Sequence, residues 1–503
     1  MTNEEWFKLR KYPHIGLPIT AKEKSKVCKY VKDSKKISKH SFLPFIHKQI
    51  HSKRTKKQYD EFGSPRRNHE NKKVRKTIQP KIRDIYYASH LDANIYSYYS
   101  SLLMKNYENL LVSKELNEVV TAYRKIRHNQ NRNKCNIDFA NEVFNYIREN
   151  NDRDLVAIAV DITGFFDNLD HKILKKSWCK VMNYETLPID HYKVFKSITK
   201  YSHIEENLLF KIFKNEILTE KKPGFIKRKK VKRIEYMKTQ NAIAFCEKKD
   251  IHKIRSNGLI VDNKYDKKGK LKDYGICQGS PISSTLANLY MLDFDDIIYN
   301  KVKEINGLYR RYSDDIVVIC DKEHKEQITS LLNQSIVNVS RLEIKAEKTQ
   351  IFHFEYRKNK RVCLQEFSEK INSNSINSNF EYLGFSFDGE QTYLKTSSLS
   401  RYYRKMKSGV RRRAFYSKRM RNDSNGKIFN RALYKQYSYI GSYRSLKYKR
   451  VFGKTDQWKK TSVYNWGNFI TYTNMASKIL DSNKVKKQTK NHWKNLNKEI
   501  SKF

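Results

Sequence analysis

The chain has 503 residues, of which 103 are Lys or Arg and 53 are Asp or Glu, so its formal charge is +50. Such an excess destabilises a compact state by self-repulsion, and the polyanion that most often relieves it is nucleic acid. Aromatic residues make up 13 % of the chain, which favours packed cores over disorder. Apolar runs such as Leu155–Val160 are far shorter than the roughly 18 residues that span a bilayer, so no membrane partner is expected.

The seven cysteines are odd in number and widely separated, which opposes both a disulfide framework and a paired-cysteine zinc site. The opening residues MTNEEWFKLRK lack the apolar core of a signal peptide. Together these features predict a soluble protein of a reducing compartment. His47 and His51 could share one face of a helix as metal ligands, but no third ligand follows them, so no metal site is expected there.

The first 150 residues divide into two parts. Residues 1–72 are basic and weakly periodic, and they predict either a solvated extension or an RNA-binding arm. Residues 73–150 begin as a strand and become helical after Ser89, with a second amphipathic helix over 137–147. The run Leu155–Val160 then predicts a strand buried on both faces, which ends in Asp161.

Three features follow this strand. Residues 180–270 form a basic insert with the run Lys227–Arg233, either a solvated loop or a flap that contacts phosphate. Residues 275–400 return to alternating strands and helices. Residues 401–503 carry 28 Lys or Arg against 4 Asp or Glu, interleaved with ten tyrosines and three tryptophans, and their ending over 469–500 predicts helices. A basic surface with stacking rings is typical of a nucleic-acid groove.

Three carboxylates are conspicuous in this basic chain. Asp161 ends a buried strand, while Asp314 and Asp315 lie in a turn between the two halves of Leu308–Cys320, which predicts a hairpin with carboxylates at its tip. If the two strands are neighbours, Asp161 and Asp314 converge and repel unless a cation lies between them. Mg²⁺ prefers such oxygen ligands, and two ions can activate a 3′-hydroxyl and stabilise a departing pyrophosphate.

With these residues in place, the sequence resembles the reverse transcriptases over roughly residues 73–400. The matching segments occur in the order that family requires, and they are Lys81-Ile82-Arg83, Asp161 to Asp167, Gly275 to Ser283, Tyr312-Ser313-Asp314-Asp315, Leu342 to Thr349, and Tyr382-Leu383-Gly384-Phe385. One Asp pair is most often only a turn, but several motifs in the correct order are specific.

The resemblance implies a role for each matched residue. Asp161 and Asp314 would bind two Mg²⁺ ions (or Mn²⁺) with help from the Ile162 carbonyl, and Asp315 would support them. Lys348 would protonate the pyrophosphate. The nucleotide would be held by Lys81, Arg83, Phe166, Gln278 and Gly279, with Phe166 excluding a 2′-hydroxyl. Tyr382, Leu383 and Gly384 would grip the primer.

Two features depart from the common pattern. Cys277 stands where Pro is usual, and the segment between Asp161 and Gln278 is much longer than in retroviral enzymes. No ribonuclease H or HNH nuclease segment is recognisable after residue 400. The run Asn133–Ala140 and the helical ending resemble a bacterial branch, the abortive-infection and defence-associated reverse transcriptases.

Membership of this branch would imply an RNA-templated DNA polymerase of the bacterial cytoplasm, active against phage. Its partners would be dNTPs, the DNA product and an RNA template, often a small non-coding RNA. Homo-oligomers and priming from a protein hydroxyl would be expected in some members, and Tyr434, Tyr437, Tyr439 and Tyr443 are candidates by composition. A retron- or intron-type enzyme and a catalytically silent RNA-binding scaffold remain alternatives.

The expected fold is therefore α/β, of the right-hand polymerase type with an antiparallel sheet in its palm. The expected parts are a basic N-terminal extension (1–72), fingers (73–150), a palm with an insert at about 180–270 (151–400) and a helical basic thumb or C-terminal region (401–503).

Overall fold

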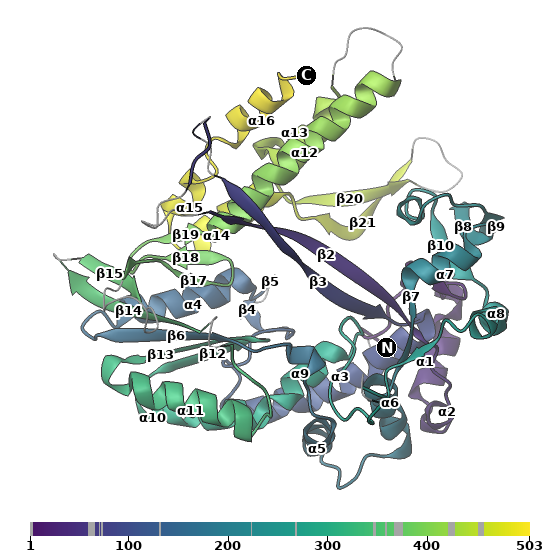
Figure 1. Cartoon of the computed structure of the whole chain (residues 1–503), viewed down its shortest axis with the longest axis horizontal. Helices are drawn as coiled ribbons and strands as arrows, with labels where there is room; N and C mark the ends of the chain where they lie inside the picture. Colours follow the sequence, from purple (N-terminus) through teal and green to yellow (C-terminus); the bar gives the residue numbers. More distant parts are fainter. Residues whose placement is uncertain are drawn as a thin grey trace. The chain divides into compact units, whose positions relative to one another are not determined.

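The computed structural model describes residues 4–58, 66–69, 71, 74–129, 132–222, 224–266, 269–345, 349–357, 360–366, 376–420, 428–450 and 457–503 (Figure 1). The chain forms two compact units, and each is assembled from three separate stretches. Unit 1 contains residues 1–123, 162–299 and 332–344. Unit 2 contains residues 124–161, 300–331 and 345–503. The parts expected from the sequence are contiguous, whereas these units interleave along the chain.

Unit 1 is built on two sheets of order β1-β10-β8-β9 and β11-β7-β2-β3. Their strands are β1 (His14–Ile15), β2 (Phe45–Lys57), β3 (Arg75–Tyr87), β7 (Ser202–Glu205), β8 (Ile217–Lys222), β9 (Phe225–Lys229), β10 (Ala242–Cys246) and β11 (Val261–Asp262). Its helices are α1 (Lys24–Lys32), α2 (Ser34–Ser38), α3 (His90–Ser113), α5 (His171–Met182), α6 (Ile189–Thr199), α7 (Glu206–Phe213), α8 (Ile251–Ser256) and α9 (Ser283–Tyr290).

The N-terminal part of unit 1 differs from a solvated extension. Strand β2 pairs antiparallel with β3 and parallel with β7, and Ile15 and Ile46 lie in a buried cluster with Ile204, Leu209 and other apolar residues of the insert. The described residues from 14 to 57 thus help to build the core of unit 1. The switch from strand to helix at Ser89 is confirmed, because the Ser89 hydroxyl accepts the Asp92 backbone N–H and caps α3.

Unit 2 contains a sheet of order β12-β13-β6-β14-β15-β16 and two smaller sheets, β17-β18-β19 and β20-β21, beside the short pair β4-β5. Its strands are β4 (Arg127–Asn129), β5 (Arg132–Asn133), β6 (Leu155–Asp161), β12 (Leu308–Tyr312), β13 (Asp315–Asp321), β14 (Gln350–Arg357), β15 (Lys360–Gln365), β16 (Ile376–Asn377), β17 (Phe380–Tyr382), β18 (Phe385–Phe387), β19 (Thr392–Leu394), β20 (Ser445–Arg450) and β21 (Trp458–Asn465). Its helices are α4 (Asn136–Glu149), α12 (Thr396–Met420), α13 (Asn430–Tyr437), α14 (Phe469–Ile479), α15 (Asn483–Lys487) and α16 (His492–Ile500). In sequence, α10 (Leu292–Glu304) and α11 (Lys325–Asn338) each cross from one unit to the other.

The strand predicted over 155–160 occupies the interior of the large sheet. β6 pairs antiparallel with β13 on one side and β14 on the other, and most of its side chains are buried. The expected mixed α/β fold with an antiparallel sheet is therefore confirmed. No helix among the described residues is both long enough and apolar enough to cross a membrane.

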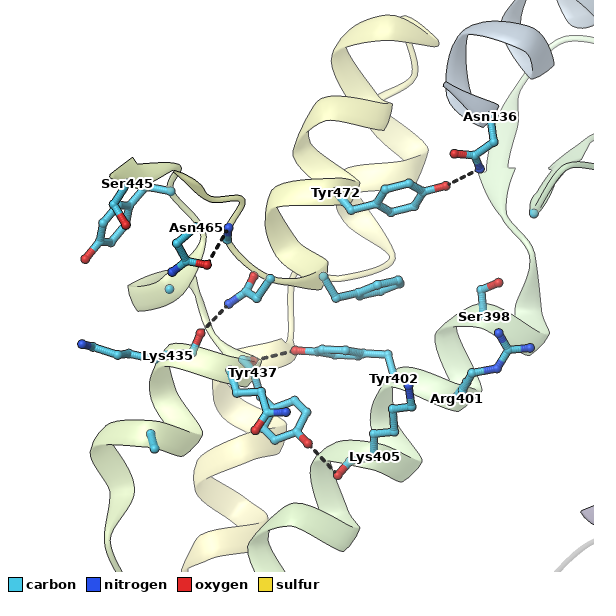
Figure 2. A pocket seen from close by; sticks show the side chains of 18 of the residues that line it. Asn136, Ser398, Arg401, Tyr402, Lys405, Lys435, Tyr437, Ser445, Asn465 and Tyr472 are labelled. Carbon is cyan, nitrogen blue, oxygen red and sulfur yellow. Dashed lines mark hydrogen bonds between the residues drawn. The ribbon is translucent and has the colours of Figure 1, made fainter. Parts of the chain in front are cut away.

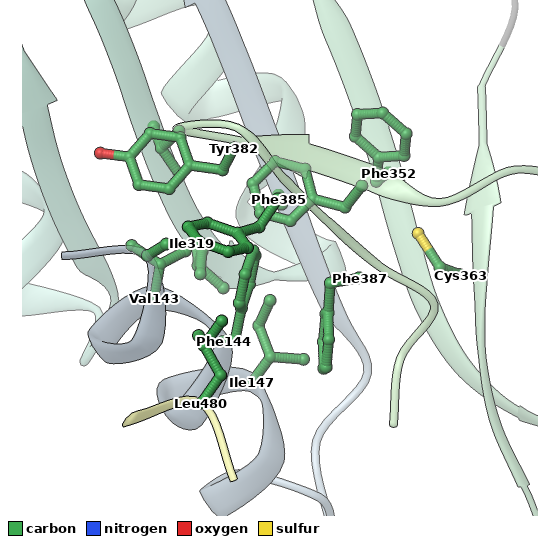
Figure 3. Close-up of a cluster of buried hydrophobic side chains, with 14 of the residues drawn as sticks. Val143, Phe144, Ile147, Ile319, Phe352, Cys363, Tyr382, Phe385, Phe387 and Leu480 are labelled. Carbon is green, nitrogen blue, oxygen red and sulfur yellow. The ribbon is translucent and has the colours of Figure 1, made fainter. Parts of the chain in front are cut away.

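One face of the large sheet supports the main core of unit 2 (Figure 3). Phe144 of α4 stacks on Phe387 of β18 with ring centroids 4.9 Å apart, and Phe352 and Phe380 pack beside them. Leu480, close to the C-terminal end of α14, joins the same buried cluster. The basic C-terminal region is thus part of the core of unit 2.

The helices predicted over 469–500 are confirmed as α14, α15 and α16. The C-terminal region also contains an antiparallel hairpin of β20 and β21, which the sequence did not predict. The Arg444 guanidinium lies over the Tyr464 and Trp466 rings, at 3.8 and 4.2 Å from their centroids. Such aromatic and cationic contacts favour a strand pair over a helix here.

Candidate active site

The candidate carboxylates lie at one end of the large sheet of unit 2. Asp161 is the last residue of β6, and it stands directly opposite Asp315, the first residue of β13. Directly opposed residues of an antiparallel pair project from the same face of the sheet. Further along these strands that face carries Ala157, Val317 and Ile319, which lie in the buried cluster. The two carboxylates therefore continue an apolar row at the point where it leaves the core.

Asp314 is held by a tight turn. Tyr312 pairs with Asp315, so Ser313 and Asp314 alone connect β12 to β13. Ser313 has φ +63°, the left-handed conformation that glycine usually supplies at such a hairpin position. The surrounding structure maintains it: Ser313 is 3 % exposed, and the wholly buried Arg311 donates from Nη1 to its carbonyl oxygen at 3.2 Å. This strained, buried turn fixes where the Asp314 side chain begins.

These three acids suit a divalent cation by the chemistry of their donors. Carboxylate oxygens are the ligands that Mg²⁺ prefers, and three of them gather here in a strongly basic protein. Among the described residues, two sets of three side chains have ligand atoms within 4.8 Å of one another. Asp161, Asp314 and Asp315 belong to neither set.

Tyr382 of β17 lies within the electrostatic reach of Asp315. Its phenol is 4 % exposed, and its hydroxyl is buried without a hydrogen-bond partner among the described residues. Burial raises the pKa of Tyr382 far above its ordinary value, and the nearby negative charge of Asp315 raises it further. The phenol is therefore a neutral donor beside the acidic group, directly before the turn of Leu383 and Gly384.

That turn forms part of the wall of a cavity of about 760 Å³ (Figure 2). Leu383 and Gly384 have φ of +45° and +95°, and the Leu383 carbonyl accepts a hydrogen bond of 3.0 Å from Asn136 Nδ2. The same amide donates to the Tyr472 hydroxyl at 3.0 Å. Asn136 thus ties the turn to α14. It is a contact that sequence reasoning missed, because its partners come from distant parts of the chain.

The rest of this cavity is basic and aromatic. Arg401, Lys405 and Lys435 line it, and no Asp or Glu is among its lining residues. Tyr402 stacks on Phe469 with ring centroids 4.7 Å apart and donates its hydroxyl to the Tyr437 carbonyl at 2.6 Å. A cavity with cations and held rings suits a polynucleotide backbone and its bases.

The predicted nucleotide-binding residues lie in unit 1, and the loop with Gln278 and Gly279 contacts β3 there. The Gln278 carbonyl accepts the Tyr86 backbone N–H at 2.7 Å. Gly279 has φ +115°, and a Cβ at this position would lie 2.8 Å from the Tyr86 carbonyl oxygen. Only glycine permits both this conformation and this close approach.

Phe166 lies beside the same loop. It is half-buried in a short 3₁₀ turn (Phe165–Asp167), and its carbonyl accepts the Ile276 backbone N–H at 2.9 Å. A Cβ on Gly275 would lie 2.7 Å from the Asp167 carbonyl oxygen. Backbone contacts thus hold Phe166 and the residues before Gln278 together.

Lys81 and Arg83 are exposed on β3. Asp84 follows Arg83 on β3. Burial raises the pKa of Asp167, and the negative charge of Asp84 raises it further. β3 therefore passes near the segment that contains Phe166.

Ile162 forms a bridge with Ile344. Lys348, the expected general acid, lies outside the described residues.

Part of the chain is similar to known proteins. Residues 226–387 match the family described as reverse transcriptase (RNA-dependent DNA polymerase). The matched segment includes Gln278, Gly279, Asp314, Asp315 and the Tyr382 turn. Over these residues the match agrees with the resemblance to reverse transcriptases that the sequence motifs carry. No curated protein matches the chain.

Similar solved structures include two yeast telomerases. Apo telomerase from Candida tropicalis, truncated from its C-terminal domain, has a TM-score of 0.36 at 11 % identity, covering 75 % of this chain and 61 % of its own. Telomerase from Candida albicans, in complex with a TWJ fragment of telomeric RNA, has a TM-score of 0.36 at 12 % identity, covering 76 % of this chain and 52 % of its own. The chain thus spans less than two thirds of the length of either telomerase.

Proposed function

We propose that this protein, whose residues 226–387 match the reverse transcriptase family, synthesises DNA on an RNA template from deoxynucleoside triphosphates. The observation that carries the proposal is the pairing of Asp161 with Asp315, beside a turn that fixes Asp314. Such a carboxylate group in a chain of charge +50 is what nucleotidyl transfer along a polyanion requires. The basic cavity next to Leu383 and Gly384 supports a primer-binding role for that turn.

In this proposal Asp161, Asp314 and the Ile162 carbonyl hold Mg²⁺ or Mn²⁺, and Asp315 supports them. Two such ions, when bound, activate the primer 3′-hydroxyl and stabilise the departing pyrophosphate. Tyr382 presents a neutral donor beside Asp315 and orders the primer-side turn. Lys348 supplies the proton to the pyrophosphate.

Unit 1 supplies the nucleotide-binding residues. Lys81 and Arg83 offset the triphosphate charge, which their exposure on β3 supports. The Gln278 and Gly279 backbone allows close approach of template and nucleotide, and Phe166 excludes a ribose 2′-hydroxyl. Deoxynucleotides are then the preferred substrates.

The test is incorporation of dNTPs by the purified full-length protein on a primed RNA template. Activity that depends on Mg²⁺, stops with a chelator and is lost in Asp314→Ala is expected. Asp321→Asn is the matched control, because Asp321 lies on the same strand and face about 20 Å from Asp315. Equal activity in Asp314→Ala and the wild type would refute the site.

We further propose a role in antiphage defence within the bacterial cytoplasm, with a small non-coding RNA as template and a homo-oligomer as the working form. This rests on the resemblance to defence-associated reverse transcriptases. Sequencing the RNA and DNA that co-purify from the native operon tests it. One abundant small RNA with complementary DNA is expected, whereas an intron or a branched RNA–DNA product would favour the mobility-type alternative. Bound RNA without any polymerase activity would favour the silent scaffold.

Priming from a protein hydroxyl also belongs to this proposal. Of the four candidate tyrosines, Tyr437 is 8 % exposed and its hydroxyl donates to the Lys405 carbonyl at 3.0 Å. Tyr443 is 60 % exposed and lines the cavity that Leu383 and Gly384 also line. Tyr443 is therefore the candidate we favour. DNA covalently attached to the wild type and absent from Tyr443→Phe would support it.

A further inference from the structure

Strand register in unit 1 gathers four ionisable side chains on one face of the sheet β11-β7-β2-β3. β2 and β7 are neighbours in this sheet (Figure 1). They run parallel, with His47 opposite Glu205 and Phe45 opposite His203. His203 and Glu205 are two residues apart on β7, so they share a face with His47. The ligand atoms of His47, His203 and Glu205 all lie within 4.8 Å of one another.

The histidine in the middle has a partner on each nitrogen. His47 is 5 % exposed, its Nδ1 faces a Glu205 carboxylate oxygen, and its Nε2 is 2.8 Å from Asp84 Oδ1. A neutral imidazole carries one N–H and can donate to only one of these carboxylates. The other ring nitrogen of His47 therefore needs either a proton of its own or a metal ion that it shares with Glu205.

The second histidine distinguishes these two possibilities. His203 Nδ1 is buried and has no hydrogen-bond partner among the described residues. Its ring lies 5.4 Å from the His47 ring, centroid to centroid, at 86°. A proton on His47 leaves this nitrogen unsatisfied, at the usual cost of burying a polar atom without a partner. A metal ion bound by one ring nitrogen of each histidine and by a Glu205 oxygen would serve all three residues at once.

We propose that His47, His203 and Glu205 bind a zinc ion. Two imidazoles and a carboxylate are typical zinc ligands, and three protein ligands leave one position for water or a further group. Asp84 then accepts from the remaining N–H of His47, which is the usual way in which a carboxylate orients a ligating histidine.

The zinc ion would fasten strands that are distant in sequence. It joins β2 to β7 directly, and through Asp84 it orders β3, which carries Arg83 at the preceding position. Tyr86 stacks on His47 with centroids 4.6 Å apart and covers one side of the site. The other group of close ligand atoms, Asp321, Glu323 and His324, carries no such inference, because Arg153 already holds Asp321 through two hydrogen bonds of 2.8 and 2.6 Å.

The test uses untagged full-length protein, with metal content measured after gel filtration. We expect about one zinc per chain in the wild type. After removal by a chelator, Zn²⁺ alone should raise the Tm, and Co²⁺ should give a visible absorption spectrum of ligand-bound cobalt. His203→Gln and Glu205→Gln should each lose the bound zinc and the Tm response. His51→Gln, at an exposed histidine on the same strand, should keep both.

Wild-type protein that retains no zinc and whose Tm does not respond to Zn²⁺ overturns the proposal. Zinc retained equally by His203→Gln and Glu205→Gln also overturns it, since the ion would then be bound elsewhere. Neither readout depends on polymerase activity, so the result is independent of the proposed function.

Discussion

Asp161 and Asp315 stand directly opposite each other at the ends of β6 and β13, and their strands lead back into an apolar core. The pairing places two acids on one face, and the buried turn at Ser313 adds Asp314 next to them. Rigid strands and a strained turn thus position a group that would disperse by repulsion on a flexible loop.

Gly279→Ala tests the close approach of the loop to β3. The added Cβ would lie 2.8 Å from the Tyr86 carbonyl oxygen, in a backbone conformation with φ +115°. We expect a raised KM for dNTPs and a loss of roughly 1–3 kcal/mol in stability. Gly258→Ala is the control, since Gly258 also has positive φ (+63°) but no atom within 4 Å of its Cβ position. Equal effects of the two variants would mean that backbone strain alone, and no contact with β3, is responsible.

Phe166→Val tests sugar selection. A smaller side chain should admit the 2′-hydroxyl, so the ratio of ribonucleotide to deoxynucleotide incorporation should rise by roughly tenfold or more. Phe165 is the contrasting position, because it is 4 % exposed and belongs to the core. Phe165→Leu should lower the Tm without changing the ratio. An unchanged ratio in Phe166→Val would assign Phe166 to packing.

His14 predicts a pH dependence of stability. Its ring is fully buried, Nδ1 accepts the Ile15 backbone N–H at 2.8 Å and Nε2 lies 3.2 Å from the Tyr87 carbonyl oxygen, so the neutral form fits. Burial lowers the pKa of His14 from 6.5 to about 4. Between these two pKa values, His14 is protonated in the unfolded chain and neutral in the folded chain. Stability is therefore complete above pH 6.5 and falls by about 3 kcal/mol as the pH drops to 4.

Urea unfolding of the wild type and of His14→Gln across this pH range checks the prediction. The variant should start less stable at neutral pH and show a shallower decline. Parallel curves for the two proteins would contradict it, and His90, whose pKa burial also lowers to about 4, would then be the group to replace.

The arginines of α12 predict a salt dependence. Arg401, Arg404, Arg412 and Arg413 line a cavity of about 650 Å³ that has no Asp or Glu in its wall. Replacing all four by Gln should reduce the slope of log affinity against log salt, for single-stranded RNA, by about 3. Deleting residues 401–503 is unsuitable, because Leu480 and Val485 belong to the core of unit 2. An unchanged slope would mean that this surface binds something other than RNA.

The sequence was most informative where local pattern and burial agree. The run Leu155–Val160 is apolar throughout because β6 buries side chains on both faces of the sheet, and Ser89 precedes a helix that it caps. Strand β2 was missed because it is rich in Lys and His, and its conformation is set by pairing with β3 and β7. The sequence suggests His51 as the partner of His47, because the two are spaced as on one face of a helix. In the structure the neighbours of His47 are His203 and Glu205, which the pairing of β2 with β7 brings from a distant part of the chain.

The most direct test of the proposed active site replaces each of the two opposed carboxylates in turn and measures RNA-templated dNTP incorporation with Mg²⁺. Asp161→Asn and Asp315→Asn should each lower the rate by roughly 10³-fold or more, with Tm near that of the wild type. Asp321→Asn, on the same face at the far end of β13, should keep the rate. Wild-type rates in both Asp161→Asn and Asp315→Asn, with folding intact, would show that the site of synthesis lies elsewhere.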